Sequence, residues 1–265
     1  MVARVGLIIP SSNRMAEQEM ISAFPAGVVA HVTRLRMTGA NHLPFDQLIP
    51  RVEEAARALV DARCDVVAFH CTANSMEGGK AGEDQILATL ARAAALTSEA
   101  SGQRGNSEMR ALHATTTITA IQRAFEALNA RRIVLITPYS ASTTEHEALF
   151  LRGAGYDVLS AKGFALAGSD AYCATPPQFW RDRAIEAARP DADAYLISCA
   201  NISVLGVIDE LEARLDRPVV TSNQSVVWDA LRLLGWRDLR GCPGRLFAKT
   251  SAESAGAPSP AGVSV

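Results

Sequence analysis

Short apolar runs alternate along the chain with longer stretches in which apolar residues recur every three or four positions. The short runs, rich in Val and Ile, are typical of buried strands, and the longer periodicity is typical of amphipathic helices. Strands are expected at 5–10, 28–34, 66–69, 111–114, 133–137, 157–161, 194–198 and 218–221. Helices are expected at 16–23, 48–62, 85–95, 117–128, 144–153, 177–188, 204–215 and 225–234. This alternation predicts an α/β fold with parallel sheets covered by helices.

The same pattern occurs twice in the chain. RVGLIIPSSN is echoed by RIVLITPYSA, and DVVAFHCTANS by DAYLISCANIS, in each case 128 positions further on. In both copies 61 positions separate the proline from the cysteine, Pro10 from Cys71 and Pro138 from Cys199. A duplicated half-domain is the simplest interpretation. If a two-fold axis relates the halves, Cys71 and Cys199 follow equivalent strands, and their thiols face each other across the cleft between the halves.

The repeat predicts how the chain divides. Residues 1–116 together with 223–250 are expected to form the first α/β half, and residues 117–222 the second. Residues 97–110, rich in Gly and Ser, interrupt the first copy and are expected to form an inserted surface loop. Residues 251–265 lack apolar periodicity and are expected to be a disordered tail.

Composition and charge narrow the classes of function. With 265 residues, 48% hydrophobic and 20% charged, the chain can bury one or two cores. A net charge of −2 and a pI of about 6.2 lack the basic excess of a nucleic-acid-binding protein. No apolar run reaches the roughly 18 to 20 residues that span a bilayer, and no secretory signal is evident, so a cytoplasmic protein without a membrane partner is expected. The five cysteines, odd in number and scattered, favour reduced thiols.

Two of these cysteines, Cys71 and Cys199, are candidates for a catalytic role. A lone cysteine at the end of a buried strand is more often structural than catalytic. Cys71 and Cys199, however, stand at equivalent positions and have similar residues after them, whereas Cys64, Cys173 and Cys242 have no such partners. Two opposed thiols suit proton transfer to, or attack on, a small molecule. Because a thiol of ordinary pKa is only a few per cent ionised at neutral pH, the site is expected to lower the thiol pKa through turn amides and hydroxyls.

The histidines favour neither a dyad nor a metal site. His70 adjoins Cys71, but neighbouring side chains on a strand point to opposite faces, which argues against a Cys-His pair. The remaining four show no metal-ligand spacing, so no metal is expected: His31, His42, His113 and His146.

A family resemblance rests on four segments taken together. They are GLIIPSSN, CTANSMEGG, TPYS and SCANISVLGVIDELEARLDRPVVTSNQ. In their order and spacing, over nearly the whole chain, the sequence resembles the aspartate/glutamate racemase superfamily, and most closely its maleate cis-trans isomerase and arylmalonate decarboxylase branch. The resemblance implies two Rossmann-like halves related by a pseudo-two-fold axis, an active site in the cleft between them, no cofactor, and a homodimer or homotetramer. Dinucleotide binding is not expected, because no GxGxxG follows the first strand.

The resemblance also implies site residues. Cys71 is expected to be the nucleophile and Cys199 the opposing acid/base. Asn13 and Tyr139 match carboxylate-binding positions, although Asn13 also suits a helix cap and Tyr139 a cover for the interface. Amide, phenol and turn N–H groups can stabilise a carboxylate or an enediolate without placing a cation beside the thiolate. The full expected substrate-binding set is Ser12, Asn13, Thr72, Ala73, Tyr139, Ser169, Asp170, Ala200 and Asn201.

One segment departs from the family pattern. Where maleate isomerase-like sequences carry an Asn after the strand that follows TPYS, this chain has GFALAGSDAYCATPP, with Ser169 or Asp170 near that place. If Asp170 enters the site, its charge would repel one carboxylate of a dicarboxylate. A substrate with an amide, hydroxyl or amine at that end would then be favoured.

The sequence therefore favours a cofactor-independent isomerase acting on maleate or a maleate-like unsaturated acid. A thiolate would add to the alkene, the resulting single bond would rotate, and elimination would release the trans product. Three alternatives stay open. They are an amino-acid or hydantoin racemase working by two-thiol proton transfer, an arylmalonate-type decarboxylase, for which one thiol suffices, and a non-catalytic carboxylate-binding protein.

Overall fold

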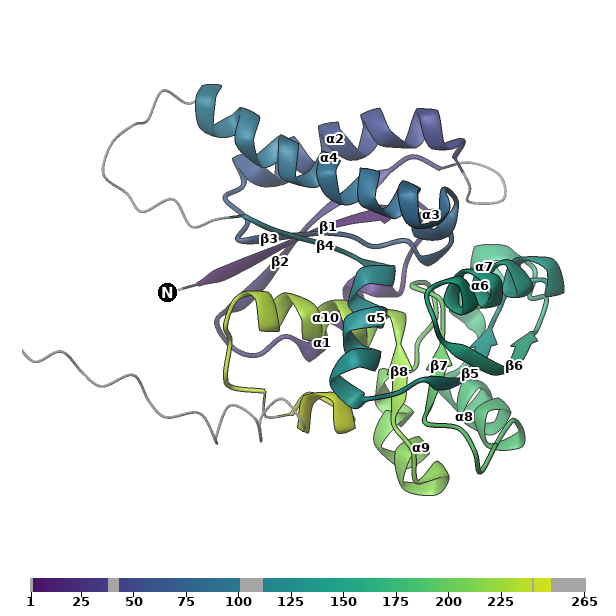
Figure 1. The fold of residues 1–265 in the computed structure, drawn as a ribbon. Helices are drawn as coiled ribbons and strands as arrows, with labels where there is room; N and C mark the ends of the chain where they lie inside the picture. The colour runs from purple at the N-terminus through teal and green to yellow at the C-terminus, as the bar shows by residue number, and fades with distance from the viewer. Residues whose placement is uncertain (1, 38–42, 101–111, 240, 249–265) are drawn as a thin grey trace, which may run out of the picture.

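The computed structural model describes residues 2–37, 43–100, 112–239 and 241–248, and it contains two four-stranded parallel sheets (Figure 1). The first sheet has the order β2-β1-β3-β4, and the second has the order β6-β5-β7-β8. The equal strand order confirms the predicted pair of Rossmann-like halves. The strands are β1 (Ala3–Pro10), β2 (Val28–Leu35), β3 (Val66–Phe69), β4 (His113–Thr116), β5 (Arg132–Thr137), β6 (Asp157–Gly163), β7 (Ala194–Ile197) and β8 (Val219–Thr221).

Helices cover both sheets. In the first half α2 and α4 lie on one face of the sheet and α1 and α10 on the other, while α8 and α9 pack against the second sheet (Figure 1). Strands covered on both faces read as continuous apolar runs. The helices are α1 (Ala16–Ala23), α2 (Phe45–Asp61), α3 (Thr72–Met76), α4 (Gly79–Ala100), α5 (Thr117–Leu128), α6 (Ala141–Gly153), α7 (Gly168–Ala174), α8 (Pro177–Glu186), the 3₁₀ turn η1 (Leu205–Val207), α9 (Ile208–Leu215) and α10 (Ser222–Leu233).

The repeat extends to individual hydrogen bonds. Asp65 Oδ2 accepts from the Arg4 amide at 2.8 Å, and Asp193 Oδ2 accepts from the Arg132 amide at the same distance, across an equal sequence separation of 61. Asp65 directly precedes β3 and is bonded to β1, and Asp193 precedes β7 and is bonded to β5. Cys71 and Cys199 follow β3 and β7. Because the strands are parallel, β3 and β7 end at corresponding edges of their sheets. The repeat thus fixes the positions of both cysteines.

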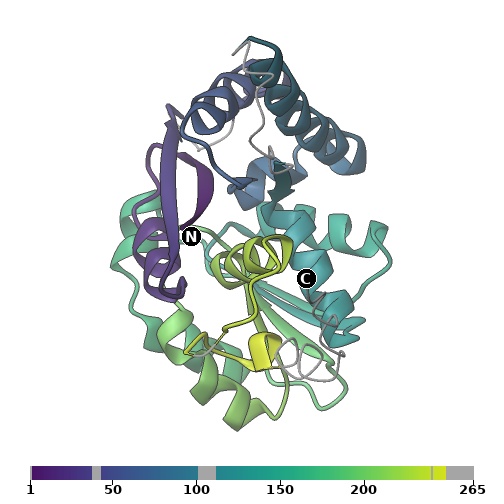
Figure 2. The same cartoon turned by 90° about the vertical axis from the view of Figure 1, so that its left-hand side faces the viewer.

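The helices that follow the last strand of each half pack against each other. α5 begins after a threonine cap, Thr116, which accepts from the Thr119 amide, and α10 begins after Thr221, which accepts from the Gln224 amide. In the view of Figure 2 the two halves lie one above the other, with α10, in yellow-green, between them. The domain boundaries at 116/117 and 222/223 stay a prediction.

The structure differs from the sequence-based expectations at the end of α4 and at α3 and α7. Helix α4 continues to Ala100, so the loop expected at 97–110 is wrong over its first four residues, and its remainder lies outside the described residues. The tail expected at 251–265 lies outside them as well. Helices α3 and α7 were not expected, because five and seven residues are too short to show a helical period. No helix in the described part of the chain is long and apolar enough to cross a membrane.

Candidate active site

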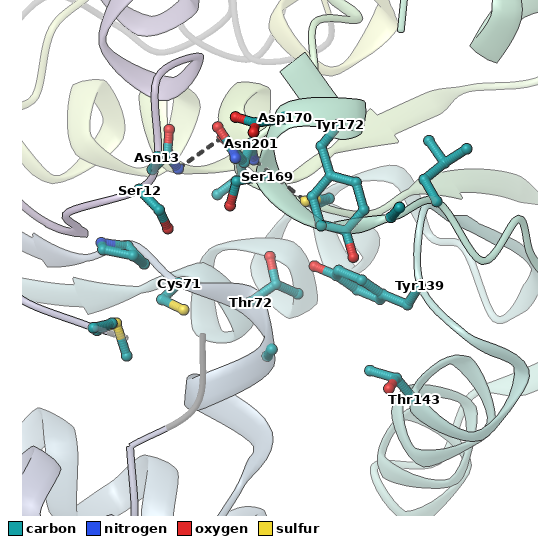
Figure 3. Close-up of a pocket in the computed structure, with 18 of the residues that line it drawn as sticks. Ser12, Asn13, Cys71, Thr72, Tyr139, Thr143, Ser169, Asp170, Tyr172 and Asn201 are labelled. Atoms are coloured by element: carbon teal, nitrogen blue, oxygen red, sulfur yellow. Dashed lines mark hydrogen bonds between the residues drawn. The ribbon is translucent and has the colours of Figure 1, made fainter. Parts of the chain in front are cut away.

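A pocket of about 760 Å³ lies between the two halves. All eleven residues expected from the sequence line it, and they come from the ends of β1, β3, β5 and β7 and from α7. The side chains of Cys71, Thr72, Tyr139 and Tyr172 point toward one shared space (Figure 3). The eleven are Ser12, Asn13, Cys71, Thr72, Ala73, Tyr139, Ser169, Asp170, Cys199, Ala200 and Asn201. Within the described ranges no three His, Cys, Asp or Glu side chains gather in a way that could hold a metal ion.

Cys71 stands where β3 ends and the short helix α3 begins. Its side chain is buried, and its thiol donates to Asn74 Oδ1 at 3.4 Å. Burial raises the pKa of the thiol to about 11, and the backbone amides of Asn74 and Ala73 offset part of that rise. The thiol is therefore protonated at neutral pH, with N–H donors placed to receive the charge of a thiolate.

Cys199 holds the equivalent position after β7. The amide of Asn201 donates to its sulfur at 3.3 Å. Burial raises the pKa of this thiol to about 12, and hydrogen bonds from the Tyr139 hydroxyl and the Asn201 amide lower it in part. The expectation that the site lowers the thiol pKa is wrong for both cysteines, because the loss of solvation outweighs the nearby donors.

A tyrosine pair forms one wall of the pocket. The rings of Tyr139 and Tyr172 meet edge to face, with centroids 6.0 Å apart. Burial, followed by the nearby Cys199, raises the pKa of Tyr172 to about 12. Burial also holds the pKa of Tyr139 well above its ordinary value, so both phenols stay protonated donors. Sequence reasoning missed Tyr172 because the family resemblance pointed only to Ser169 and Asp170 in that segment, which now forms α7.

One hydroxyl connects the two cysteine loops. Ser222, the first residue of α10, lies 3.0 Å from the Thr72 hydroxyl and accepts from the Cys199 amide at 3.1 Å. The side chains of Thr72 and Ser222 are both buried. Ser222 therefore contacts both Thr72, which follows Cys71, and the backbone of Cys199. The repeat offered a signal for it, because Ser222 is the counterpart of Thr117 at the start of α5.

Asn13 acts as a helix cap and also bridges the halves. Its Oδ1 accepts from the amides of Met15 and Ala16 at the start of α1. Its Nδ2 donates to the carbonyl of Ala200, beside Cys199, at 3.0 Å (Figure 3). One of the two amide hydrogens is used in this way, which leaves the second for the pocket.

Asp170 lies at the rim and does not place an uncompensated charge inside the pocket. Its side chain is 92% exposed and pairs with the Arg14 guanidinium at 2.6 Å. The Arg14 amide in turn donates to Asn201 Oδ1 at 2.8 Å. Asp170 thus lines the pocket with its charge compensated by Arg14, which weakens the repulsion expected for a dicarboxylate.

His70 belongs to a buried hydrogen-bond network behind the pocket. Its Nε2 lies 2.8 Å from Asn223 Oδ1, and its Nδ1 lies 3.0 Å from the Thr117 hydroxyl. Asn223 Nδ2 donates to Glu19, whose other oxygen accepts from the loop that follows Cys199. Burial lowers the pKa of His70 to about 4, so the ring is neutral and both its nitrogens are occupied away from the thiol. His70 is therefore structural in this arrangement.

Comparison with known proteins places the chain in a family. The family model for arylmalonate decarboxylase matches residues 5–247. The chain belongs to the arylmalonate decarboxylase family. It is 29% identical over 247 residues to the arylmalonate decarboxylase of Bordetella bronchiseptica, covering 92% of this chain and 95% of that protein.

Solved structures that resemble this chain include maleate isomerases. The maleate isomerase Iso of Pseudomonas putida S16 superposes with a TM-score of 0.83 and 24% identity, covering 94% of this chain and 100% of the other. The maleate cis-trans isomerase of Nocardia farcinica, solved as a cysteine-to-serine mutant with a covalently bound succinylcysteine intermediate, gives 0.81 and 22%, covering 93% and 98%. These two likenesses establish the fold.

Proposed function

We propose that this chain is a cofactor-independent isomerase that converts maleate, or a maleate-like unsaturated acid, into its trans isomer. The observation that carries the proposal is the pair Cys71 and Cys199, which stand at equivalent positions of the repeat and line one pocket. The succinylcysteine intermediate of the Nocardia farcinica enzyme supports a mechanism in which cysteine bonds to the substrate.

In the proposed reaction Cys71 is the nucleophile and Cys199 the acid/base. The Cys71 thiol first loses its proton to solvent. The thiolate then adds to one alkene carbon, a C–S bond forms, and the π electrons move toward the neighbouring carbon and its carboxylate. Cys199 gives its proton to that neighbouring carbon. The central bond, now single, rotates. The Cys199 thiolate then removes a proton from the same carbon, the double bond reforms and the C–S bond breaks, which returns Cys199 as the thiol and Cys71 as the thiolate.

The polar lining suits the charge that develops on the carboxylate. The free amide hydrogen of Asn13, the Thr72 hydroxyl, the Tyr139 phenol and Asn201 all line the pocket. We assign these groups, with the turn amides at Ala73 and Ala200, to the substrate carboxylates. Neutral donors stabilise an enediolate without holding the thiolate in an ion pair.

Decarboxylation is the second candidate, because the family model and the Bordetella bronchiseptica relative are arylmalonate decarboxylases. Protonation of the enolate left after loss of carbon dioxide needs one acid only. The presence of a second buried thiol favours the isomerase. The two candidates differ in whether Cys71 is required.

Proton NMR of the enzyme with maleate in deuterated buffer tests the proposal. The unaltered protein is expected to form fumarate, and Cys71→Ser and Cys199→Ser are expected to form none. Cys242→Ser is the matched control, since this half-buried thiol is not among the residues that line the pocket and donates to the Ala23 carbonyl, as a serine hydroxyl can. Unchanged maleate with every variant, together with carbon dioxide release from an aryl malonate by Cys71→Ser, would favour the decarboxylase.

We further propose that the enzyme works in the cytoplasm as a homodimer or homotetramer. All five of its cysteines are free thiols, which suits a reducing compartment. Light scattering coupled to gel filtration measures the assembly. A monomer mass would contradict that part of the proposal.

A further inference from the structure

Tyr172 on α7 is a pocket side chain that has no role in the proposed mechanism. It is half-buried and lines the pocket together with Tyr139. Its hydroxyl makes no hydrogen bond to another described residue, and it points into the pocket (Figure 3). A tyrosine hydroxyl in a protein interior normally has a partner. The hydroxyl of Tyr172 is therefore placed to bond to a ligand.

Two contacts attach α7 to the site. Before the helix begins, the amide of Ala165 donates to the carbonyl of Tyr139 at 2.8 Å. Within the helix, the thiol of Cys173, the residue after Tyr172, donates to Asn201 Oδ1 at 3.3 Å. The helix is thus bonded both to the residue that supplies the other phenol and to the loop that follows β7. These two contacts fix the place of Tyr172 at the pocket wall.

Helix α7 turns its acidic residue outward and its phenol inward. Residues two positions apart on an α-helix point about 200° apart around its axis. Asp170 is 92% exposed and pairs with Arg14 at the rim. Tyr172 points toward the space that Cys71 and Thr72 also face (Figure 3). The helix therefore supplies a neutral hydrogen-bond donor to the interior and keeps its carboxylate at the edge.

A neutral donor matters here because the pocket lining carries no positive charge. None of the described residues that line the pocket is Lys, Arg or His. The two charges of a dicarboxylate must therefore be stabilised by neutral donors. The Tyr139 hydroxyl already bonds to the Cys199 sulfur, and the Thr72 hydroxyl lies 3.0 Å from that of Ser222. The hydroxyl of Tyr172 has no such bond within the described part of the chain.

We propose that Tyr172 is a specificity-determining residue that donates a hydrogen bond to one carboxylate of the substrate and so favours a dicarboxylate over a monocarboxylate. The proposal rests on the proposed function. The Tyr139 ring meets the Tyr172 ring edge to face, with centroids 6.0 Å apart, so the phenol is held in position before substrate binds. A hydrogen bond to an ionised acceptor is about twice as strong as one between neutral groups, which makes a second carboxylate the preferred partner.

The expected effect of Tyr172 is on binding. Substrate and product carry the same two carboxylates, so a hydrogen bond to one of them is made throughout the reaction. Loss of such a bond raises KM and leaves kcat nearly unchanged. A residue that only supported the shape of the site would instead lower kcat when replaced, because the thiols would be misplaced.

The test uses Tyr172→Phe, which keeps the ring and removes the hydroxyl. Isothermal titration calorimetry measures the Kd of cis-cyclopropane-1,2-dicarboxylate, which holds two carboxylates in the cis arrangement of maleate and has no alkene for a thiol to attack. The variant is expected to bind it about tenfold more weakly, the size of one hydrogen bond to a charged group. The Kd of cyclopropanecarboxylate, which has one carboxylate, is expected to stay unchanged. With maleate as substrate, KM should rise about tenfold.

Tyr156→Phe is the matched control. It removes a phenol hydroxyl that is not among the pocket residues and that donates to the Gln122 carbonyl at 3.3 Å. This control is expected to bind both acids as the unaltered protein does.

Three results would overturn the proposal for Tyr172. They are an unchanged Kd for the dicarboxylate in Tyr172→Phe, an equal loss of affinity for both acids, and a fall in kcat without a rise in KM. Each of these leaves the isomerase reaction standing. If the unaltered protein does not bind the dicarboxylate at all, the proposed substrate class is wrong and the role of Tyr172 is wrong with it.

Discussion

Replacing Glu147 by Gln is expected to stabilise the protein at neutral and alkaline pH. Glu147 lies on α6, where its carboxyl is fully buried and neither oxygen has a hydrogen-bond partner among the described residues. Burial raises its pKa from 4.5 to about 7. Below pH 4.5 the group is protonated in the folded and the unfolded chain, so it adds no pH dependence. As the pH rises from 4.5 to 7, the unfolded chain ionises it and the folded chain does not, and stability falls.

The size of this loss follows from the pKa difference. One pKa unit corresponds to 1.36 kcal/mol, so a rise of roughly 2.5 units amounts to about 3 kcal/mol. The loss is complete above pH 7 and absent below pH 4.5. Glutamine does not titrate, so Glu147→Gln should match the unaltered protein at pH 4 and exceed its free energy of unfolding by about 3 kcal/mol at pH 8.

Urea denaturation at pH 4, 6 and 8 measures this difference. Glu145→Gln, on the same helix, serves as the control, because it removes an exposed ion pair with Arg152 and should change the free energy of unfolding by less than about 1 kcal/mol at any pH. If the difference between Glu147→Gln and the unaltered protein were the same at pH 4 and pH 8, the carboxyl would not be buried and unpaired as described.

The remaining predictions concern the pocket. Because burial raises the pKa of Cys71 to about 11, the rate of isomerisation should rise about tenfold per pH unit between pH 6 and 9, and a flat pH-rate profile would argue against this buried thiol as the nucleophile. Ser222→Ala leaves an interior amide without its acceptor and frees Thr72, so it should cost about 1 to 3 kcal/mol in urea denaturation and lower kcat/KM, whereas an unchanged kcat/KM would show that the bridge does not position the site. Asp170→Asn removes an exposed pair with Arg14 and should leave the midpoint of urea denaturation nearly unchanged, and a large gain in affinity for maleate would show that the charge does oppose a dicarboxylate.

The sequence predicted those parts of the fold that recur in the internal repeat or that are long enough to show an apolar period. The spacing from Pro10 to Cys71 equals that from Pro138 to Cys199, and this predicted two equivalent sheets. Two copies of one local sequence pattern form the same strands in the same order. Helices α3 and α7 escaped because one or two turns carry no measurable period. Tyr172 was missed because the resemblance pointed only to its neighbours Ser169 and Asp170 on α7.

Two properties of the site depend on three-dimensional packing, and sequence reasoning could not give them. The raised pKa of the Cys71 thiol arises from burial by distant segments, which outweighs the amides that the local sequence supplies. The salt bridge of Asp170 joins it to Arg14, 156 positions away, and a single sequence does not show such pairs. The counterpart of Glu19 at 147 was visible in the repeat, but only the structure shows that one is bonded and the other is not.

The central claim is that Cys71 bonds to the substrate while Cys199 moves the proton. It is tested most directly by mixing Cys199→Ser with maleate, quenching with acid and mapping the peptides by mass spectrometry. The account predicts that the peptide containing Cys71 gains the mass of one maleate, and that Cys71→Ser shows no such gain at any cysteine. Fumarate formed by the unaltered protein without an adduct on Cys71, or an adduct carried by Cys199 in the Cys71→Ser variant, would contradict it.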